Sequence, residues 1–356
     1  MGLFDNMLKD NESLFMNEIA LDYDFMPKIL KFRENEQQRI AECIRPLFQK
    51  RNGSNMIVHG APGIGKTVAA KKVLENLEEE TDDIIPIYIN CWQNNSTYKI
   101  ILEMCEKLNY KLTMNKNTVE LMKIVVGLLN KKTSVLVFDE IDKADDLDFL
   151  YTFLEQLYRK SIILITNYKT HVLKMDDRIK SRLTPETLEF KPYNSEEING
   201  ILRQRLEWAF VNSVWDEEAF QLVAAKTLEF EDMRKGLYLL KESGNAAETK
   251  SSRKITMEHV KKAIEKLESF SKTDLSQLSD NEKKILELIK QNPNCRMGDL
   301  YKQVQEKTKD SISYKTFQRT VEKLAKLKLI TAKKITGGAE GSTKILNPKE
   351  KKLTEF

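Results

Sequence analysis

One segment of the chain has the residue types and the spacing needed to hold phosphate groups. Gly60-Ala61-Pro62-Gly63-Ile64-Gly65-Lys66-Thr67 matches the pattern G-x-x-x-x-G-K-[ST]. Its glycines let backbone N–H groups turn inward around phosphate oxygens, and the positive end of a following helix points at the same oxygens. We expect Lys66 to reach the β- and γ-phosphates and the Thr67 hydroxyl to coordinate Mg²⁺. The segment, together with Val68, therefore predicts a site for ATP or ADP with Mg²⁺.

A pair of carboxylates further along the chain supplies the second half of this predicted site. Asp139 and Glu140 come directly after the apolar run 135–138. A buried strand that ends in two carboxylates places them at the carboxyl edge of a sheet, beside the phosphate loop. We expect Asp139 to hold the Mg²⁺ shell and Glu140 to orient or deprotonate the water that attacks the γ-phosphate. The alternative is a surface acidic pair with no part in chemistry.

Three more polar side chains are candidates for contact with the reacting phosphate. Asn167 follows the apolar run 162–166, so its amide is expected to reach the γ-phosphate or the attacking water. Arg178 and Arg182 lie in a charged segment that we interpret as a loop. A guanidinium neutralises charge on a transferring phosphoryl group, often from a neighbouring subunit. The alternative for either arginine is simple solvation.

These residues need a framework that brings the ends of several strands together. The sequence predicts strands at 55–58, 84–90, 134–138 and 161–166, and the last two are continuously apolar, as in strands buried on both faces. Strands that alternate with helices imply parallel crossovers, so the expected fold class is α/β with a parallel, doubly wound sheet. The predicted helices span residues 36–49, 67–77, 96–108, 119–130 and 146–160.

The rest of the chain has a different pattern. From Asn194 to about residue 268 the periodicity is helical only, and 268–279 is interpreted as a linker. Further helices are predicted at 280–291, 297–307 and 313–329, followed by a two-stranded hairpin with glycines at its tip. The expected domains are a core at 1–193, an all-α lid at 194–270 and a winged helix-turn-helix at 271–356.

Charge is unevenly distributed along the chain. From Lys272 to Phe356 there are 19 lysines and arginines against 11 acidic residues, a net charge of +8, which leaves −4 on the remaining 271 residues. A basic domain on an acidic body predicts an anionic partner at the carboxyl end, with nucleic acid as the first choice and a solvated lysine-rich surface as the alternative.

The helix predicted at 313–329 allows a geometric test of nucleic-acid binding. At 100° per residue its apolar side chains fall on one face, and Lys315, Arg319 and Lys326 fall close to the opposite direction. We expect the apolar face to pack inside the domain and the basic face to enter a major groove. Lys333 and Lys334 on the hairpin would add contacts to the DNA backbone.

Several features of the sequence indicate the cellular compartment of the protein. The four cysteines are scattered without paired spacing, which predicts neither a disulfide framework nor a zinc site. Residues 1–10 have no basic and apolar signal pattern, and no apolar run approaches the length of a membrane span. We therefore expect a cytoplasmic, nucleoid-associated protein without a membrane partner.

The motifs together resemble the AAA+ family, in its archaeal replication-initiator branch, from about Asp22 to about Pro348. Besides the phosphate loop and the carboxylate pair, the resemblance rests on the following segments: 31–36, 89–91 with 97–98, 178–183, 231–235 and the terminal winged helix. It implies that Asn167 is sensor one, Arg182 the arginine finger and Arg234 sensor two. It also implies that residues 92–99 form an extra helix that touches DNA.

The same resemblance implies a cellular function and a set of partners. A protein of this branch would bind duplex DNA at an origin together with other initiator subunits, help to load the replicative helicase, and hydrolyse ATP slowly as a switch. The sequence departs from the usual family pattern at two places. Glu231-Asp232 occupies the place where the family usually has Gly-Asp, and Glu340 lies at the hairpin tip where an arginine is expected.

Two other kinds of protein remain as alternatives. One is a signalling or defence ATPase whose winged helix contacts proteins instead of DNA. The other is a transposition-helper ATPase, which would bind DNA without sequence preference.

Overall fold

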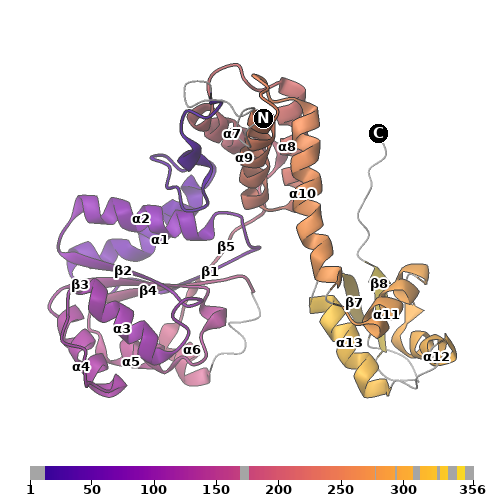
Figure 1. The fold of residues 1–356 in the computed structure, drawn as a ribbon. Coiled ribbons are helices and arrows are strands. Elements are labelled where there is room, and N and C mark those ends of the chain that lie inside the picture. Colours follow the sequence, from indigo (N-terminus) through magenta and orange to yellow (C-terminus); the bar gives the residue numbers. More distant parts are fainter. Residues whose placement is uncertain are drawn as a thin grey trace. The chain divides into compact units, whose positions relative to one another are not determined.

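The computed structural model describes residues 13–168, 176–276, 278–292, 295–307, 313–326, 329–335 and 343–348. The chain divides into two compact units, Met1–Ala263 and Ile264–Phe356 (Figure 1). Within the described residues, no helix has the length and apolar character needed to cross a membrane.

The first unit is built on a five-stranded sheet in which every neighbouring pair is parallel, in the order β2-β3-β4-β1-β5. The parallel α/β class expected from the sequence is therefore confirmed. The strands are β1 (Met56–His59), β2 (Ile84–Asn90), β3 (Thr133–Asp139), β4 (Lys160–Thr166) and β5 (Glu186–Glu189). The edge strand β5 was not predicted, because Leu188 is its one buried residue and three exposed polar residues surround it.

Helices cover both faces of this sheet (Figure 1). Every residue of β3 is buried, and its side chains alternate between two separate cores. Val135 and Val137 pack on the side of α1 and α2, whereas Leu136 and Phe138 pack on the side of α3, α4 and α5. Burial on both faces explains why the strand is a continuous apolar run. These helices are α1 (Glu34–Ile44), α2 (Lys66–Glu80), α3 (Thr97–Lys107), α4 (Thr118–Leu129) and α5 (Asp148–Gln156).

Two of the predicted helices are too long. The helix expected at 36–49 ends at Ile44, and a 3-10 turn that contains Pro46 follows, since proline has no N–H to continue the helical ladder. As a result Phe48 is 49% exposed instead of belonging to the apolar stripe. The helix expected at 146–160 ends at Gln156, because Lys160 already begins β4.

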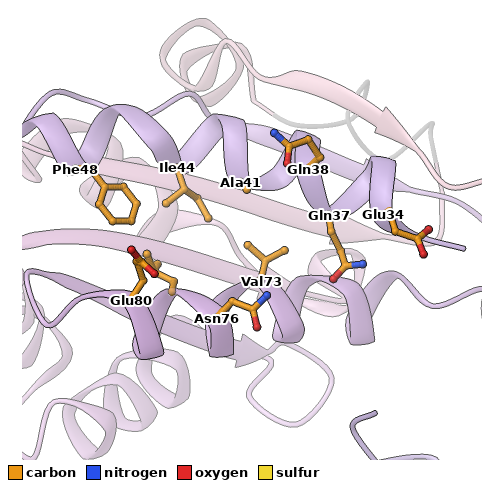
Figure 2. Close-up of a pocket in the computed structure, with 10 residues that line it drawn as sticks. Glu34, Gln37, Gln38, Ala41, Ile44, Phe48, Val73, Asn76 and Glu80 are labelled. Carbon is orange, nitrogen blue, oxygen red and sulfur yellow. The ribbon is translucent and has the colours of Figure 1, made fainter. Parts of the chain in front are cut away.

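A shallow groove of about 450 Å³ lies between α1 and α2 (Figure 2). Ile44, Val73 and Leu77 form its apolar floor, and Glu34 and Glu80 lie on its rim. Val73 is seven residues beyond Lys66 on α2, which is about 10 Å along a helix. This groove is therefore separate from the phosphate loop.

The helical part of the first unit begins where the sequence predicts it. Asn194 caps α7 in a capping box with Glu197, so the helix starts at Ser195 as expected. Asp232 caps α9 through the N–H of Arg234. The helices are α7 (Ser195–Ala209), α8 (Glu217–Phe230), α9 (Met233–Thr249) and the first part of α10 (Met257–Ser276), since the boundary between the two units follows Ala263. The linker predicted at 268–279 is wrong over most of its length, because α10 continues to Ser276.

The second unit has the winged helix-turn-helix arrangement expected from the sequence. Helices α11, α12 and α13 pack on a three-stranded antiparallel sheet in the order β6-β8-β7, with Phe317, Val321, Leu324 and Leu346 fully buried in the core. The short strand β6 was not predicted. The predicted hairpin tip with Glu340 lies outside the described residues. The elements are α11 (Asp280–Gln291), β6 (Cys295–Arg296), α12 (Met297–Lys307), α13 (Tyr314–Lys326), β7 (Ile330–Ile335) and β8 (Thr343–Pro348).

Candidate nucleotide-binding and hydrolysis site

The phosphate-loop motif connects the end of β1 to the start of α2, the context the motif needs. Gly63 and Gly65 have φ of 77° and 92°, a region that favours glycine. A side chain at Gly63 would also collide with the Asp232 carboxylate, which lies against this turn of the loop. Lys66 is the first residue of α2, so the positive end of that helix faces the loop.

The amine of Lys66 is held inside the loop. It donates to the carbonyl oxygens of Gly60 at 2.9 Å and Ala61 at 2.7 Å, and to Oδ1 of Asn167 at 2.9 Å. Burial lowers the pKa of Lys66 to about 8. The structure therefore brings together two residues that lie 101 positions apart in the sequence, both expected to meet the γ-phosphate.

The lowered pKa of Lys66 makes nucleotide affinity sensitive to pH. A bound phosphate favours the charged amine, so binding above pH 8 must be coupled to proton uptake. We expect the affinity for ADP to fall as pH rises from 8 to 9.5, by up to about tenfold per pH unit. Calorimetry in buffers of different ionisation enthalpy measures the uptake directly. A dissociation constant that stays unchanged up to pH 9.5 would contradict the assignment.

Asp139 is buried and accepts hydrogen bonds from three donors. Its Oδ2 accepts from the Thr67 hydroxyl at 2.5 Å and from the Tyr88 hydroxyl at 2.8 Å, and its Oδ1 accepts from the Glu140 N–H at 2.8 Å. Hydroxyl and carboxylate oxygens are the ligands that Mg²⁺ prefers. Thr67 and Asp139 therefore offer a donor set that fits the predicted ion.

Glu140 lies at the sharp turn that follows β3. Its φ of 52° is unusual for a residue with a side chain. Burial and the neighbouring charges of Asp139 and Asp142 raise its pKa, which favours a carboxylate that accepts a proton. Glu140 and Asn167 line the same cavity, of about 390 Å³.

Asn167 is positioned by the turn that carries Glu140. Its backbone N–H donates to Asp142 at 3.4 Å, and the hydroxyl of the preceding Thr166 donates to the same carboxylate oxygen at 2.9 Å. Because β4 lies between β3 and β1 in the sheet, the ends of these strands bring Asp139, Asn167 and the phosphate loop to one edge.

Arg234 lies at the start of α9, beside the phosphate loop of the same chain. The N–H of Met233 donates to the Gly63 carbonyl at 3.2 Å. The Arg234 side chain is half exposed and donates from Nε to Asp232 at 3.2 Å. The helical part of this unit thus meets the phosphate loop through the segment predicted to carry sensor two.

Arg178 and Arg182 are on a helix and not in a loop, which corrects the sequence-based interpretation. α6 spans Asp177–Leu183, with Ile179 and Leu183 buried. The guanidinium of Arg182 lies 4.8 Å from the Tyr151 ring centroid and 3.3 Å from Glu155. Both contact residues lie on α5, so within the described residues the Arg182 side chain is directed to α5 and not to the phosphate loop of its own chain.

Arg33 was missed as a site residue, although it lies in the family-like segment 31–36. It is 4% exposed and donates to the carbonyl oxygens of Ile64 at 3.0 Å and Lys191 at 2.7 Å. Its guanidinium also stacks 3.9 Å from the Tyr193 ring centroid. Arg33 therefore holds the phosphate loop in place through the carbonyl oxygen of Ile64.

The structure describes the side chains of two of the five predicted DNA-contact residues. On α13, Lys315 and Arg319 are exposed on the face away from the buried apolar stripe. Glu322, on the same helix, pairs with Lys344 at 3.3 Å. The side chains of Lys326, Lys333 and Lys334 lie outside the described residues. The extra helix expected at 92–99 is wrong for residues 92–96, because residues 91–93 form a turn, residues 94–96 are not helical, and α3 begins only at Thr97.

Two protein-family models match this chain. Residues 49–171 match an AAA domain, and residues 199–265 match a Cdc6 AAA+ ATPase-type lid domain. The first match contains the phosphate loop and the carboxylate pair, and the second contains Arg234.

Similar proteins cover nearly the whole chain. ORC1-type DNA replication protein 1 of Sulfurisphaera tokodaii is 32% identical over an alignment of 357 positions, which covers 94% of this chain and 90% of that protein. ORC1-type DNA replication protein 2 of Methanothermobacter thermautotrophicus is 27% identical, over 97% of this chain and 94% of that protein. The solved structure of the Aeropyrum pernix ORC1 protein in complex with DNA has a TM-score of 0.69 at 26% identity, covering 94% of this chain and 93% of that chain. The chain therefore belongs to the family of ORC1-type DNA replication proteins, which are AAA+ ATPases.

Proposed function

We propose that this replication initiator binds duplex DNA at an origin, acts there with other initiator subunits, and helps to load the replicative helicase, with slow ATP hydrolysis as its switch. The observation that carries the proposal is the meeting of Lys66, Asp139 and Asn167 at one sheet edge of a chain from this family. The proposed parts are an ATPase core at 1–193, a lid at 194–270 and a winged-helix DNA-binding domain at 271–356.

Each residue of the site has a proposed task. Residues 60–68 bind the phosphates of ATP or ADP, and Thr67 and Asp139 would hold Mg²⁺, which when bound would neutralise phosphate charge. Glu140 orients the attacking water and takes up its proton, with the Asn167 amide beside it.

The two arginines are proposed to act from different chains. Contact of α9 with Gly63 supports a role for Arg234 on phosphates of the same chain. The position of Arg182 on α6, away from its own phosphate loop, supports action across a subunit boundary.

DNA binding is proposed for the second unit. The exposed Lys315 and Arg319 on α13 and the net charge of +8 on residues 272–356 support it. The Aeropyrum pernix ORC1 protein, solved with DNA, is consistent with the same use.

Substitutions on α13 test this part of the proposal. If α13 enters the major groove, Arg319→Ala is expected to cost about 1–3 kcal/mol and to relax sequence preference, provided that it contacts a guanine edge. Lys315→Ala is expected to weaken binding to all sequences and to reduce the slope of log affinity against log salt by about one. Fluorescence anisotropy of labelled duplex with the full chain, across a salt series, measures both effects.

A charge-matched control separates this effect from a general loss of positive charge. Lys226 on α8 pairs with Glu229 at 2.7 Å, so Lys226→Ala removes one charge without touching α13. It is expected to leave both affinity and salt slope unchanged. If the two α13 variants behave like this control, α13 does not contact DNA, and a winged helix that contacts proteins becomes the better description.

A further inference from the structure

Tyr88 contacts the carboxylate that is proposed to hold the metal ion. It lies on β2, where its backbone pairs with Val137 of β3, two residues before Asp139. Its hydroxyl donates to Oδ2 of Asp139 at 2.8 Å, the same oxygen that accepts from Thr67 at 2.5 Å. Two hydroxyl donors from two different elements therefore converge on one oxygen atom.

The number of acceptor sites on Asp139 shows what these bonds do. An ionised carboxylate has about four lone-pair sites, two on each oxygen. The hydroxyls of Thr67 and Tyr88 fill both sites on Oδ2, and the N–H of Glu140 fills one site on Oδ1. One site on Oδ1 remains for the metal shell. Without Tyr88 a second site opens, and the carboxylate loses one of the three bonds that fix its rotation.

The surroundings of Tyr88 hold its ring in place and keep its hydroxyl a donor. The ring packs against the core on the α1 and α2 side of the sheet, and Nζ of Lys71 lies 4.7 Å from its centroid. The hydroxyl donates to a carboxylate oxygen, which can only accept, so the phenol is the donor of this bond. A side chain that served only to fill space would not need this hydroxyl.

We propose that Tyr88 is a positioning residue for the metal site: its hydroxyl fixes the Asp139 carboxylate so that Asp139 and Thr67 present their oxygens to Mg²⁺ in one arrangement. The role rests on the proposed Mg²⁺–nucleotide function of this site. It does not include contact with the nucleotide, so Tyr88 matters for metal affinity and not for the phosphate loop itself.

The test separates nucleotide binding from metal binding. Tyr88→Phe removes only the hydroxyl. In EDTA, the affinity of the full chain for a fluorescent ADP is expected to stay within about twofold of the wild type. The Mg²⁺ concentration that gives half of the metal-dependent gain in ADP affinity is expected to rise about tenfold, the usual effect of losing a partner of a metal ligand. Tyr110→Phe, which removes the hydroxyl of a partly buried tyrosine packed against the other core, is the matched control and should change neither value.

A double substitution tests whether Tyr88 acts through Asp139. In an Asp139→Asn background, Tyr88→Phe is expected to have no further effect on Mg²⁺ dependence. Additive effects would overturn the proposal, and so would a loss of ADP binding by Tyr88→Phe in EDTA, since either result assigns Tyr88 a general structural role. A normal Mg²⁺ response in Tyr88→Phe would overturn the role of Tyr88 alone. A wild type indifferent to Mg²⁺ would instead overturn the proposed metal site, and the role of Tyr88 with it.

Discussion

Glu140→Gln is expected to bind ATP as tightly as the wild type and to hydrolyse it at least 100-fold more slowly. The amide has nearly the same shape as the carboxylate but cannot accept a proton from water, and general-base catalysis contributes about 10²–10⁴-fold to a rate. The substitution keeps the bond that residue 140 donates to Asp139, because that bond comes from the backbone N–H of residue 140. Single-turnover hydrolysis of radiolabelled ATP, together with an equilibrium binding assay, separates the two quantities.

The control for this substitution is Glu103→Gln on α3, where Glu103 pairs with Lys107 at 3.4 Å. It makes the same chemical change away from the cavity and should leave hydrolysis unchanged. Hydrolysis by Glu140→Gln at the wild-type rate would show that another group positions the water. Loss of ATP binding would show instead that the turn after β3 depends on the Glu140 carboxylate for its shape.

The parts of the site that could be predicted from the sequence are those whose chemistry is local. The phosphate loop needs only a strand before it and a helix after it, and a continuous apolar run that ends in Asp139 and Glu140 marks a buried parallel strand. Asn167 was predicted by the same logic, because it follows another buried strand. Its contact with Lys66 depends on β4 lying between β3 and β1, an order that local periodicity does not reveal.

The parts that could not be predicted depend on contacts between distant segments. Tyr88 is an ordinary strand residue in the sequence, and its bond to Asp139 exists only because β2 and β3 are paired. The segment with Arg182 is strongly charged, which favours a loop, yet Ile179 and Leu183 give it enough apolar contact to fold as α6. Tertiary packing therefore overrides the local pattern there.

Glu231 differs from the residue usual in the family, and it adopts a strained backbone conformation. Where the family usually has glycine, this residue ends α8 with a φ of 51°, the left-handed conformation that glycine adopts without strain at a helix end. The side chain is accommodated, and Asp232 still caps α9 through Arg234. The departure therefore affects the backbone energy of the turn and not the contact between α9 and the phosphate loop.

Lys66→Ala is expected to weaken binding of ATP and ADP by about 10²–10³-fold. The amine that donates to the loop carbonyls and to Asn167 is the cation available to the β- and γ-phosphates, and loss of one partner of a buried charge pair costs about 3–4 kcal/mol. Isothermal titration calorimetry or fluorescent-ADP anisotropy measures the change. The matched control is Lys72→Ala on the same helix, where Lys72 pairs with Glu75 at 2.7 Å, and its affinity should stay within about twofold of the wild type.

Thermal unfolding distinguishes lost binding from lost structure in Lys66→Ala. Burial lowers the pKa of Lys66 to about 8, so its charge is less favourable in the folded protein than in water, and removing it is not expected to destabilise the nucleotide-free chain. The melting temperature without nucleotide should therefore match that of the wild type or exceed it. The increase that saturating ADP produces in the wild type should be much smaller at the same ADP concentration, because that increase depends only on binding to the folded state. A lower melting temperature without nucleotide would mean that Lys66 stabilises the loop itself, and weaker binding could then not be assigned to the lost phosphate contact.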